Sequence, residues 1–305
     1  MVRGHLYLVL ALFSTAVSVI ALKLLLPVIN LYTYATLRFT ISSIIILFFL
    51  LMSQKKIFLA KKGPHEKPVL HLKNHFLQAI STGLLFNIFF YSGLKFTTAT
   101  SASIIGSIQP AVLTLFAFFL LKEKINNNKI WAIILSILGI VLLSLDNLSP
   151  SAVINATKRE GSFLGDGLVF LSLLPQSYYS ILLKQSKSNL TNLSSAFLVS
   201  LFAFISFLPF GLYHATDVDW SLIKGIYYLY IFLGSAAVFV FLFFWGKAME
   251  TISTSTAAVF TGLLPIMVSL LAIAFLNEVF TYADALGLIF VLTAIIIGEL
   301  PSKTR

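Results

Sequence analysis

Two stretches of the chain align without a gap, and they decide the fold. Residues 89–124 read FFYSGLKFTTATSASIIGSIQPAVLTLFAFFLLKEK, and residues 244–279 read FWGKAMETISTSTAAVFTGLLPIMVSLLAIAFLNEV. Pro110 and Pro265 are equivalent in this alignment, and each stands 13 residues before a glutamate, Glu123 or Glu278. A run of small residues precedes each proline, and an apolar helix follows it. The pattern therefore predicts that the chain contains an internal duplication.

The composition places this duplication in a membrane. Of the 305 residues, 58% are hydrophobic and only 10% are charged, and the mean hydropathy is +0.96. Soluble domains are about half apolar and about a quarter charged. These values exclude a cytosolic enzyme, a disordered chain and a fibrous protein, and they predict an all-α polytopic membrane protein.

The apolar runs predict ten transmembrane helices. A helix needs about 20 apolar residues to cross a hydrocarbon core of about 30 Å. The runs are 6–27, 31–52, 74–94, 99–121, 129–146, 164–184, 193–213, 225–247, 253–276 and 282–300. The first run resembles a signal peptide at its start, but it is too long and lacks a clear cleavage site, so we expect a retained span.

The charged residues predict the orientation of these spans. Under a ten-span topology, 15 of the 21 Lys and Arg residues lie on the side of the two termini, five lie on the other side, and Arg38 falls within a span. Basic residues favour the cytoplasm, so we expect both termini there. Each repeat holds five spans, an odd number, so the two halves, residues 1–150 and 151–305, are expected to have opposite orientations. Inverted repeats of this kind build transporters.

Several motifs of the sequence resemble those of a known family. The small-residue run, Pro110, the LKE sequence at 121–123 and the GIVLL sequence that begins at Gly139 resemble the EamA-type module of the drug/metabolite transporter superfamily. Residues 253–297 resemble a second such module, and Lys23, Lys184 and Arg38 resemble family positions. The resemblance implies ten spans with both ends inside. It also implies transport of small organic solutes, which range from amino acids and nucleotide-like metabolites to organic cations and toxic compounds.

The sequence thus favours a secondary transporter of a bacterial inner membrane that works by alternating access through a central cavity. A mostly neutral, aromatic-lined path with one arginine nearby suits an amino acid or a related zwitterion, which we expect to be exported. The alternatives are a transporter of multiple drugs, organic cations or nucleotide metabolites with the same fold. A different class, an intramembrane enzyme or a membrane signalling or assembly protein, is also considered, although no nucleophile or acid pair is found at depth.

Polar residues within spans are expected to face the bundle interior or a cavity, because a polar group facing lipid costs free energy. The candidate substrate-binding residues selected in this way are Ser14, Ser18, Arg38, Asn87, Tyr91, Ser103, Gln109, Gln176, Tyr178, Tyr179, Trp245 and Thr261. Helix packing is the alternative for the small residues, and interhelical hydrogen bonds are the alternative for Asn87 and Gln109. An interfacial aromatic belt is the alternative for the tyrosines and Trp245. For Arg38 the alternatives are a structural ion pair or carbonyl clamp and attraction of a substrate carboxylate.

The repeated prolines and glutamates have separate expected roles. Pro110 and Pro265 are expected in mid-helix, where the missing backbone donor produces either a static kink or a hinge for gating. Glu123 and Glu278 are expected to end their helices with capping contacts. No carboxylate lies near the middle of a predicted span, so the embedded acid of a typical proton relay is absent from the sequence.

The sequence gives no indication of a cofactor or a metal. It contains no cysteine, which excludes disulfides and Cys-based metal sites, and no P-loop motif. His65, His71 and His75 lie in or beside a lysine-rich loop and are expected to be solvated. The expected partners are a small-molecule substrate and the lipid bilayer, without nucleic acid. The oligomeric state is left open, and a monomer is compatible with the sequence.

Overall fold

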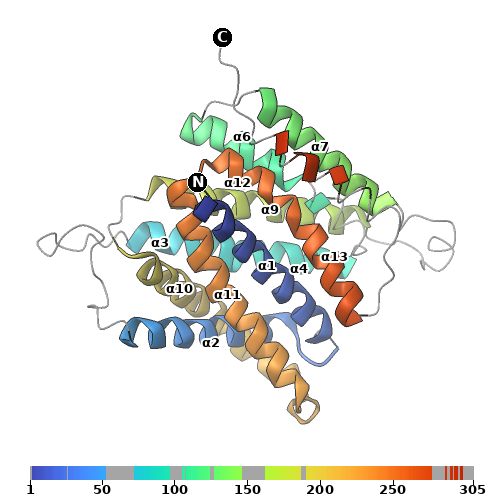
Figure 1. Ribbon diagram of the computed structural model, residues 1–305. Helices are drawn as coiled ribbons and strands as arrows, with labels where there is room; N and C mark the ends of the chain where they lie inside the picture. Colours follow the sequence, from blue (N-terminus) through green and yellow to red (C-terminus); the bar gives the residue numbers. More distant parts are fainter. Residues whose placement is uncertain are drawn as a thin grey trace, which may run out of the picture. The chain divides into compact units, whose positions relative to one another are not determined.

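The computed structural model describes residues 2–25, 27–52, 72–96, 105–106, 108–123, 127–145, 162–186, 190–276, 286, 289–290, 292–294 and 296–297. Within these residues the chain is helical and contains no β-strand (Figure 1). The helices are α1 (Val2–Leu25), α2 (Leu31–Met52), α3 (Leu72–Gln78), the π-helix η1 (Ala79–Leu85), α4 (Phe86–Phe96), α6 (Gln109–Leu121), α7 (Asn127–Leu145), α9 (Ser162–Gln185), α10 (Asn192–His214), the 3₁₀ turns η3 (Ala215–Asp217) and η4 (Trp220–Leu222), α11 (Ile226–Thr251), α12 (Thr254–Thr261) and α13 (Leu263–Leu276). The predicted all-helical class is confirmed for this part of the chain.

Five helical stretches among the described residues are long and apolar enough to cross a membrane. They are Arg3–Leu25, Leu31–Met52, Leu72–Gly93, Asn192–Asp217 and Ile226–Thr251. Shorter apolar helices cover Gln109–Leu121 and Thr254–Val268. Most of the tenth predicted span, 282–300, lies outside the described residues.

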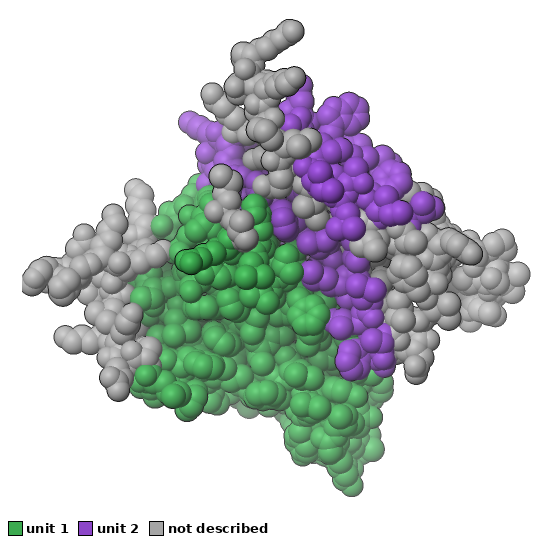
Figure 2. Space-filling view, in the orientation of Figure 1, with its two compact units in different colours: residues 1–84, 182–251 green, residues 85–181, 252–305 purple. Residues whose placement is uncertain are grey.

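The chain divides into two compact units, and each unit takes helices from both halves of the sequence. Unit 1 comprises Met1–Leu84 and Leu182–Thr251, and unit 2 comprises Leu85–Ile181 and Ile252–Arg305 (Figure 2). The chain therefore passes from one unit to the other at the end of η1, near the end of α9 and directly after α11. Two of these passages lie within helical segments, and the third is the short link Ile252–Ser253 between α11 and α12.

Unit 1 is built around two helix pairs, α1 with α11 and α2 with α10. A row of polar contacts joins α2 and its N-terminal turn to α10. Asn30 Nδ2 donates to the carbonyl oxygen of His214 at 2.7 Å, and Thr36 Oγ1 donates to that of Phe207 at 3.2 Å. Ser43 Oγ donates to Ser200 Oγ at 3.0 Å. Such hydrogen bonds hold apolar helices together where lipid weakens the hydrophobic driving force.

Two glycines allow helices of unit 1 to approach closely. A Cβ atom on Gly211 of α10 would lie 2.0 Å from Thr36 Oγ1, and one on Gly234 of α11 would lie 2.0 Å from the Tyr34 hydroxyl oxygen. Neither contact is sterically allowed. Glycine therefore permits the observed packing of α2 at both positions, and a larger residue would force neighbouring atoms to move.

In unit 2, α12 packs against α6 and α7. Ala132 of α7, Val259 of α12 and Ala294 form a small buried cluster with Leu135 beside it. Elsewhere in unit 2, α4 lies against α9 at Gly93. A Cβ atom on Gly93 would come within 2.7 Å of Val169 Cγ2. Small residues thus determine the packing in this unit as well.

The third predicted span is continuous from Leu72 to Phe96, but its central turns are π-helical. The π-helix η1 ends at Leu85, where the chain leaves unit 1. π-helical turns are rare and often mark functional sites in helices. This segment therefore combines unusual backbone geometry with a passage between units.

Candidate functional site

Both prolines of the repeat lie in the first turn of a new helix. Helix α6 begins at Gln109, and the preceding turn is closed by a bond from the Ile108 amide to the carbonyl oxygen of Ile105 at 3.0 Å. Helix α13 begins at Leu263, directly after a turn in which Gly262 N donates to Val259 O at 3.2 Å. A helix end thus lies directly before each proline, and the expectation of a kink or a hinge at these positions stays a prediction. A proline in the first turn removes a donor that has no intrahelical partner.

The start of α6 forms a polar contact with α9. Gln109 Nε2 donates to Ser177 Oγ of α9 at 2.9 Å. The Ser177 side chain is fully buried. Ile108, the residue before the helix, provides no side-chain cap for the α6 backbone. An amide, a hydroxyl and a helix N-terminus therefore occur together where the apolar helix is interrupted.

The remaining sequence candidates of unit 2 differ in their exposure. Asn87 and Tyr179 are buried, Tyr91, Gln176 and Thr261 are half-buried, and Tyr178 is exposed. The Thr261 hydroxyl donates to the carbonyl oxygen of Ala258 at 2.6 Å, which satisfies it within its own helix. Ser103 and Glu278 lie outside the described residues.

Unit 1 contains the other four candidates. The Arg38 side chain is buried, and its Nη1 donates to Ser18 Oγ of α1 at 3.3 Å. The guanidinium carbon lies 5.0 Å from the ring centroid of Phe39 and 5.6 Å from that of Tyr34, which are cation–π distances. The structure thus joins two residues selected from different predicted spans.

The other two residues have more local contacts. Ser14 is buried and its hydroxyl donates to Ala11 O, one turn earlier in α1, at 2.7 Å. Trp245 is only 3% exposed and stacks on Phe241, with ring centroids 5.6 Å apart. A largely exposed ring would be expected of an interfacial belt residue, so the burial of Trp245 favours an interior role.

Glu123 lies just beyond the end of α6 and occupies the N-terminus of α12. Its two carboxylate oxygens accept the backbone N–H groups of Thr254 and Ser255 at 3.1 and 3.3 Å. The third N–H, of Thr256, donates to Ser253 Oγ at 3.1 Å, and the fourth reaches the carbonyl oxygen of Ser253 at 3.0 Å. All four amides at the start of α12 therefore have partners, and this helix start is closed to a ligand.

These contacts also set the protonation of Glu123. Its partial burial opposes ionisation and raises its pKa, but the hydrogen bonds from Thr254 and Ser255 lower the pKa by more, so that it lies below the ordinary value of 4.5. The carboxylate is therefore charged at neutral pH, as a cap at the positive end of a helix dipole requires.

Lys184 is a residue whose role the sequence did not reveal. Its Nζ donates to the carbonyl oxygen of Met249 at 2.6 Å, in the last turn of α11. A cation at this end of a helix is favoured by the macrodipole and satisfies a carbonyl without an intrahelical partner. The sequence signal was the position of Lys184 at the end of an apolar run, but its partner depends on tertiary packing.

No group of three or more His, Asp or Glu side chains suited to a metal occurs in the part of the chain that the structure describes. His75 corrects one expectation, because it is only 1% exposed and lies in α3 rather than in solvent. His65 and His71 lie outside the described residues.

The helices and their buried polar contacts define an apolar helical membrane protein. The model of the EamA-like transporter family matches residues 2–145 and 163–298. The chain belongs to this family, which confirms the resemblance seen in the sequence. It is accordingly a membrane transporter and not an enzyme.

Individual relatives are transporters as well. The chain is 26% identical to the uncharacterized transporter YetK of Bacillus subtilis over 293 residues, which cover 94% of this chain and 83% of that protein. It is also 26% identical to an uncharacterized transporter of Archaeoglobus fulgidus, over 93% of each chain. Purine permease 2 of Arabidopsis thaliana is 37% identical over 108 residues, which cover 33% of this chain and 30% of that protein.

A solved crystal structure of a protein has the same fold. It aligns with a TM-score of 0.75 and 15% sequence identity, and covers 98% of this chain and 95% of the other. At this identity the likeness concerns the fold alone.

Proposed function

We propose that this protein is a secondary transporter that carries a small organic metabolite by alternating access, and that the start of α6 contacts the solute. The Gln109–Ser177 hydrogen bond carries this proposal. Transporters of several folds bind their solutes where a membrane helix is interrupted, because the half-helix N-terminus and its polar side chains supply hydrogen bonds at depth. The closed start of α12, occupied by Glu123, offers no equivalent donors.

An amino acid or a related zwitterion is the substrate class that best suits these groups. The Gln109 amide provides one donor pair and one acceptor without a net charge. We propose that Gln109, Ser177 and Asn87 of unit 2 contact the solute directly.

A purine or a related heterocycle is the second candidate. The similarity to Purine permease 2 over a third of the chain favours it. A glutamine amide can donate to and accept from the edge of such a ring, and tyrosines such as Tyr91 and Tyr179 can stack on its face.

We infer that the moving parts pivot at the connections between the compact units. The connection after α11 is anchored on both sides: Lys184 holds the last turn of α11 within unit 1, and Glu123 holds the first turn of α12 within unit 2. Only Ile252 and Ser253 lie between the two helices. Rigid ends on both sides would confine a change in backbone angles to this short link, as expected of a hinge.

The proposal retains ten spans in two inverted halves, with both termini in the cytoplasm of a bacterium and export as the direction. The 15 to 5 distribution of basic residues supports this orientation. The similar interruptions before Pro110 and Pro265 support the duplication. Glu123 is an unsuitable proton carrier near neutral pH because its pKa is lowered.

A ligand screen tests the proposed site. Purified protein is heated in the presence of amino acids, purines and organic cations, because a ligand that binds the folded form raises its melting temperature by mass action. We expect one solute class to stabilise the wild type and to have no effect on Gln109→Leu. Ser206→Ala, which removes a hydroxyl bonded within α10, is the control and should respond like the wild type. Equal stabilisation of Gln109→Leu would remove this residue from the site.

A further inference from the structure

Lys247 near the end of α11 has an unusual environment for a charged side chain. Its Nζ lies 4.6 Å from the ring centroid of Phe243 and 5.5 Å from that of Tyr7 on α1. Among the described residues no carboxylate forms an ion pair with it, although Glu250 is only three positions further along the helix. The ammonium is thus held by two ring faces, and its N–H donors remain available to an anion.

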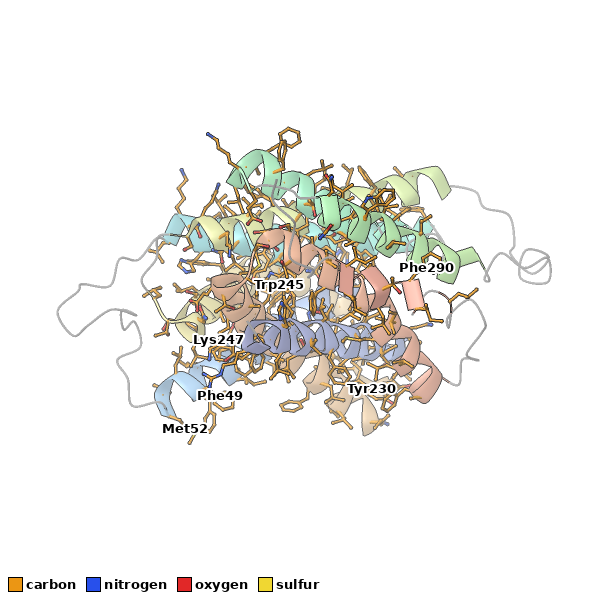
Figure 3. The ribbon with its side chains drawn as sticks, turned by 45° about the horizontal axis from the view of Figure 1, so that its top comes forward. Phe49, Met52, Tyr230, Trp245, Lys247 and Phe290 are labelled. Carbon is orange, nitrogen blue, oxygen red and sulfur yellow. The ribbon has the colours of Figure 1, made fainter. Side chains whose placement is uncertain are left out.

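Phe243, which contacts Lys247, belongs to a longer aromatic surface in unit 1. Phe243 contacts Phe239, with centroids 5.9 Å apart, and Phe239 stacks on Phe49 of α2 at 5.4 Å. Phe49 is 47% exposed, and Met52 at the end of α2 is 64% exposed. Figure 3 shows Phe49, Met52 and Lys247 toward the same end of this unit, and Tyr230 toward the other end of α11. An apolar, ring-lined surface therefore ends at a cation.

Further positive charge lies around this end. Arg3 is exposed and stands four residues before Tyr7, so both are on one face of α1. The aromatic surface suits acyl chains, and the cations suit a phosphate group. A phospholipid contains both.

We propose that the ends of α1, α2 and α11 form a binding site for an anionic phospholipid. The phosphate accepts hydrogen bonds from Lys247, with Arg3 adding attraction, and the acyl chains lie along Phe243, Phe239 and Phe49. A soluble acidic peptide would use the charge but not the exposed rings. The residues of this site all belong to unit 1, whereas Gln109 and Ser177 of the proposed solute site belong to unit 2.

The test measures the melting temperature of the purified protein in detergent micelles doped with phosphatidylglycerol or phosphatidylcholine. Phosphatidylglycerol should stabilise the wild type more strongly, and Lys247→Gln should bind it roughly fivefold more weakly, the loss expected for one basic residue at a membrane surface. Lys247→Arg should retain the preference. Lys224→Gln, which removes an exposed lysine before the other end of α11, should also retain it.

Three results would overturn the proposal. The first is an equal response of wild type and Lys247→Gln to phosphatidylglycerol. The second is an equal response of the wild type to the two lipids. The third is equal stabilisation of the wild type by inorganic phosphate. That result would mean that Lys247 binds a soluble anion rather than a lipid. Melting in phosphatidylcholine alone checks that each variant is folded.

Discussion

The Glu123 carboxylate accepts both the backbone N–H and the hydroxyl of Ser255, at 3.3 and 3.2 Å, although 132 residues separate them in the sequence. This contact ties the end of α6 to the start of α12, the helix directly before α13, and the internal repeat makes α13 the equivalent of α6. It also places a negative charge at the positive end of a helix dipole.

Removal of this carboxylate should destabilise the protein. Glu123→Ala leaves the N–H groups of Thr254 and Ser255 without their acceptor, which for a helix cap costs about 0.5–2 kcal/mol. Thermal or denaturant unfolding in detergent measures the change. Glu250→Gln, which removes the charge of an exposed carboxylate in the last turn of α11, is the control and should cost less. An equal effect of both variants would mean that the cap contributes nothing specific.

The contribution of Glu123 should depend on pH in a defined direction. Its pKa is lowered in the folded protein relative to the ordinary value of 4.5. The stabilisation is therefore fully present above about pH 4.5 and is lost as the pH falls through the lower folded pKa. The difference in melting temperature between wild type and Glu123→Gln should be constant from pH 8 to about pH 6 and should narrow only in stronger acid. A difference that vanishes near pH 6 would contradict a lowered pKa.

Gln109 and Ser177 should act as a pair in solute binding. If the hydrogen bond orients the Gln109 amide, a double-mutant cycle of Gln109→Leu and Ser177→Ala should give a coupling of about 0.5–1.5 kcal/mol in solute affinity. Strictly additive effects would show that the two side chains act separately. Gln109→Asn, which keeps the amide but shortens its reach, should weaken binding less than Gln109→Leu.

Pro110→Ala should lower the rate of transport more than the affinity for solute. Alanine restores a backbone N–H in the first turn of α6 and permits the helix to extend across the interruption, which stiffens it. Single-turnover and steady-state flux separate the two effects. An unchanged turnover with intact binding would mean that the interruption is static.

Gly211→Ala should be destabilising by about 1–3 kcal/mol, the usual cost of overpacking. The added Cβ would lie 2.0 Å from Thr36 Oγ1 and 2.7 Å from Thr36 Cβ, so α2 and α10 must separate. Gly167→Ala on α9 is the matched control, because no heavy atom lies within 4 Å of its added Cβ. A melting temperature equally affected by both substitutions would contradict the close packing of α2 and α10.

The sequence predicted the helical class because hydrophobicity over about 20 residues dominates in lipid. It also located the prolines of the repeat, but not their effect. Pro110 within an apolar run is compatible with a kink or a break, and the structure adds that α6 begins at Gln109, one residue before it. The π-helix η1 is similarly invisible, since its residues continue the apolar pattern of the third span.

The sequence did not predict which side chains form hydrogen bonds between helices. Gln109 and Arg38 stood out as polar residues at depth, but Ser177 and Ser18 became their partners through helix packing over 68 and 20 positions. The division into units differs from the halves 1–150 and 151–305 for the same reason. Helices pack where their surfaces are complementary and where small residues such as Gly211 allow close approach. Such contacts can form between helices from different halves of the sequence.

Solute counterflow across vesicles tests the central claim most directly. Proteoliposomes loaded with an unlabelled amino acid or purine are diluted into a trace of the labelled solute, and its accumulation is followed for wild type and Gln109→Leu. We predict rapid accumulation for the wild type and background accumulation for the variant, with both proteins folded and inserted to the same extent. Background accumulation of every amino acid, purine and organic cation by the wild type, or wild-type flux through Gln109→Leu, would contradict the account.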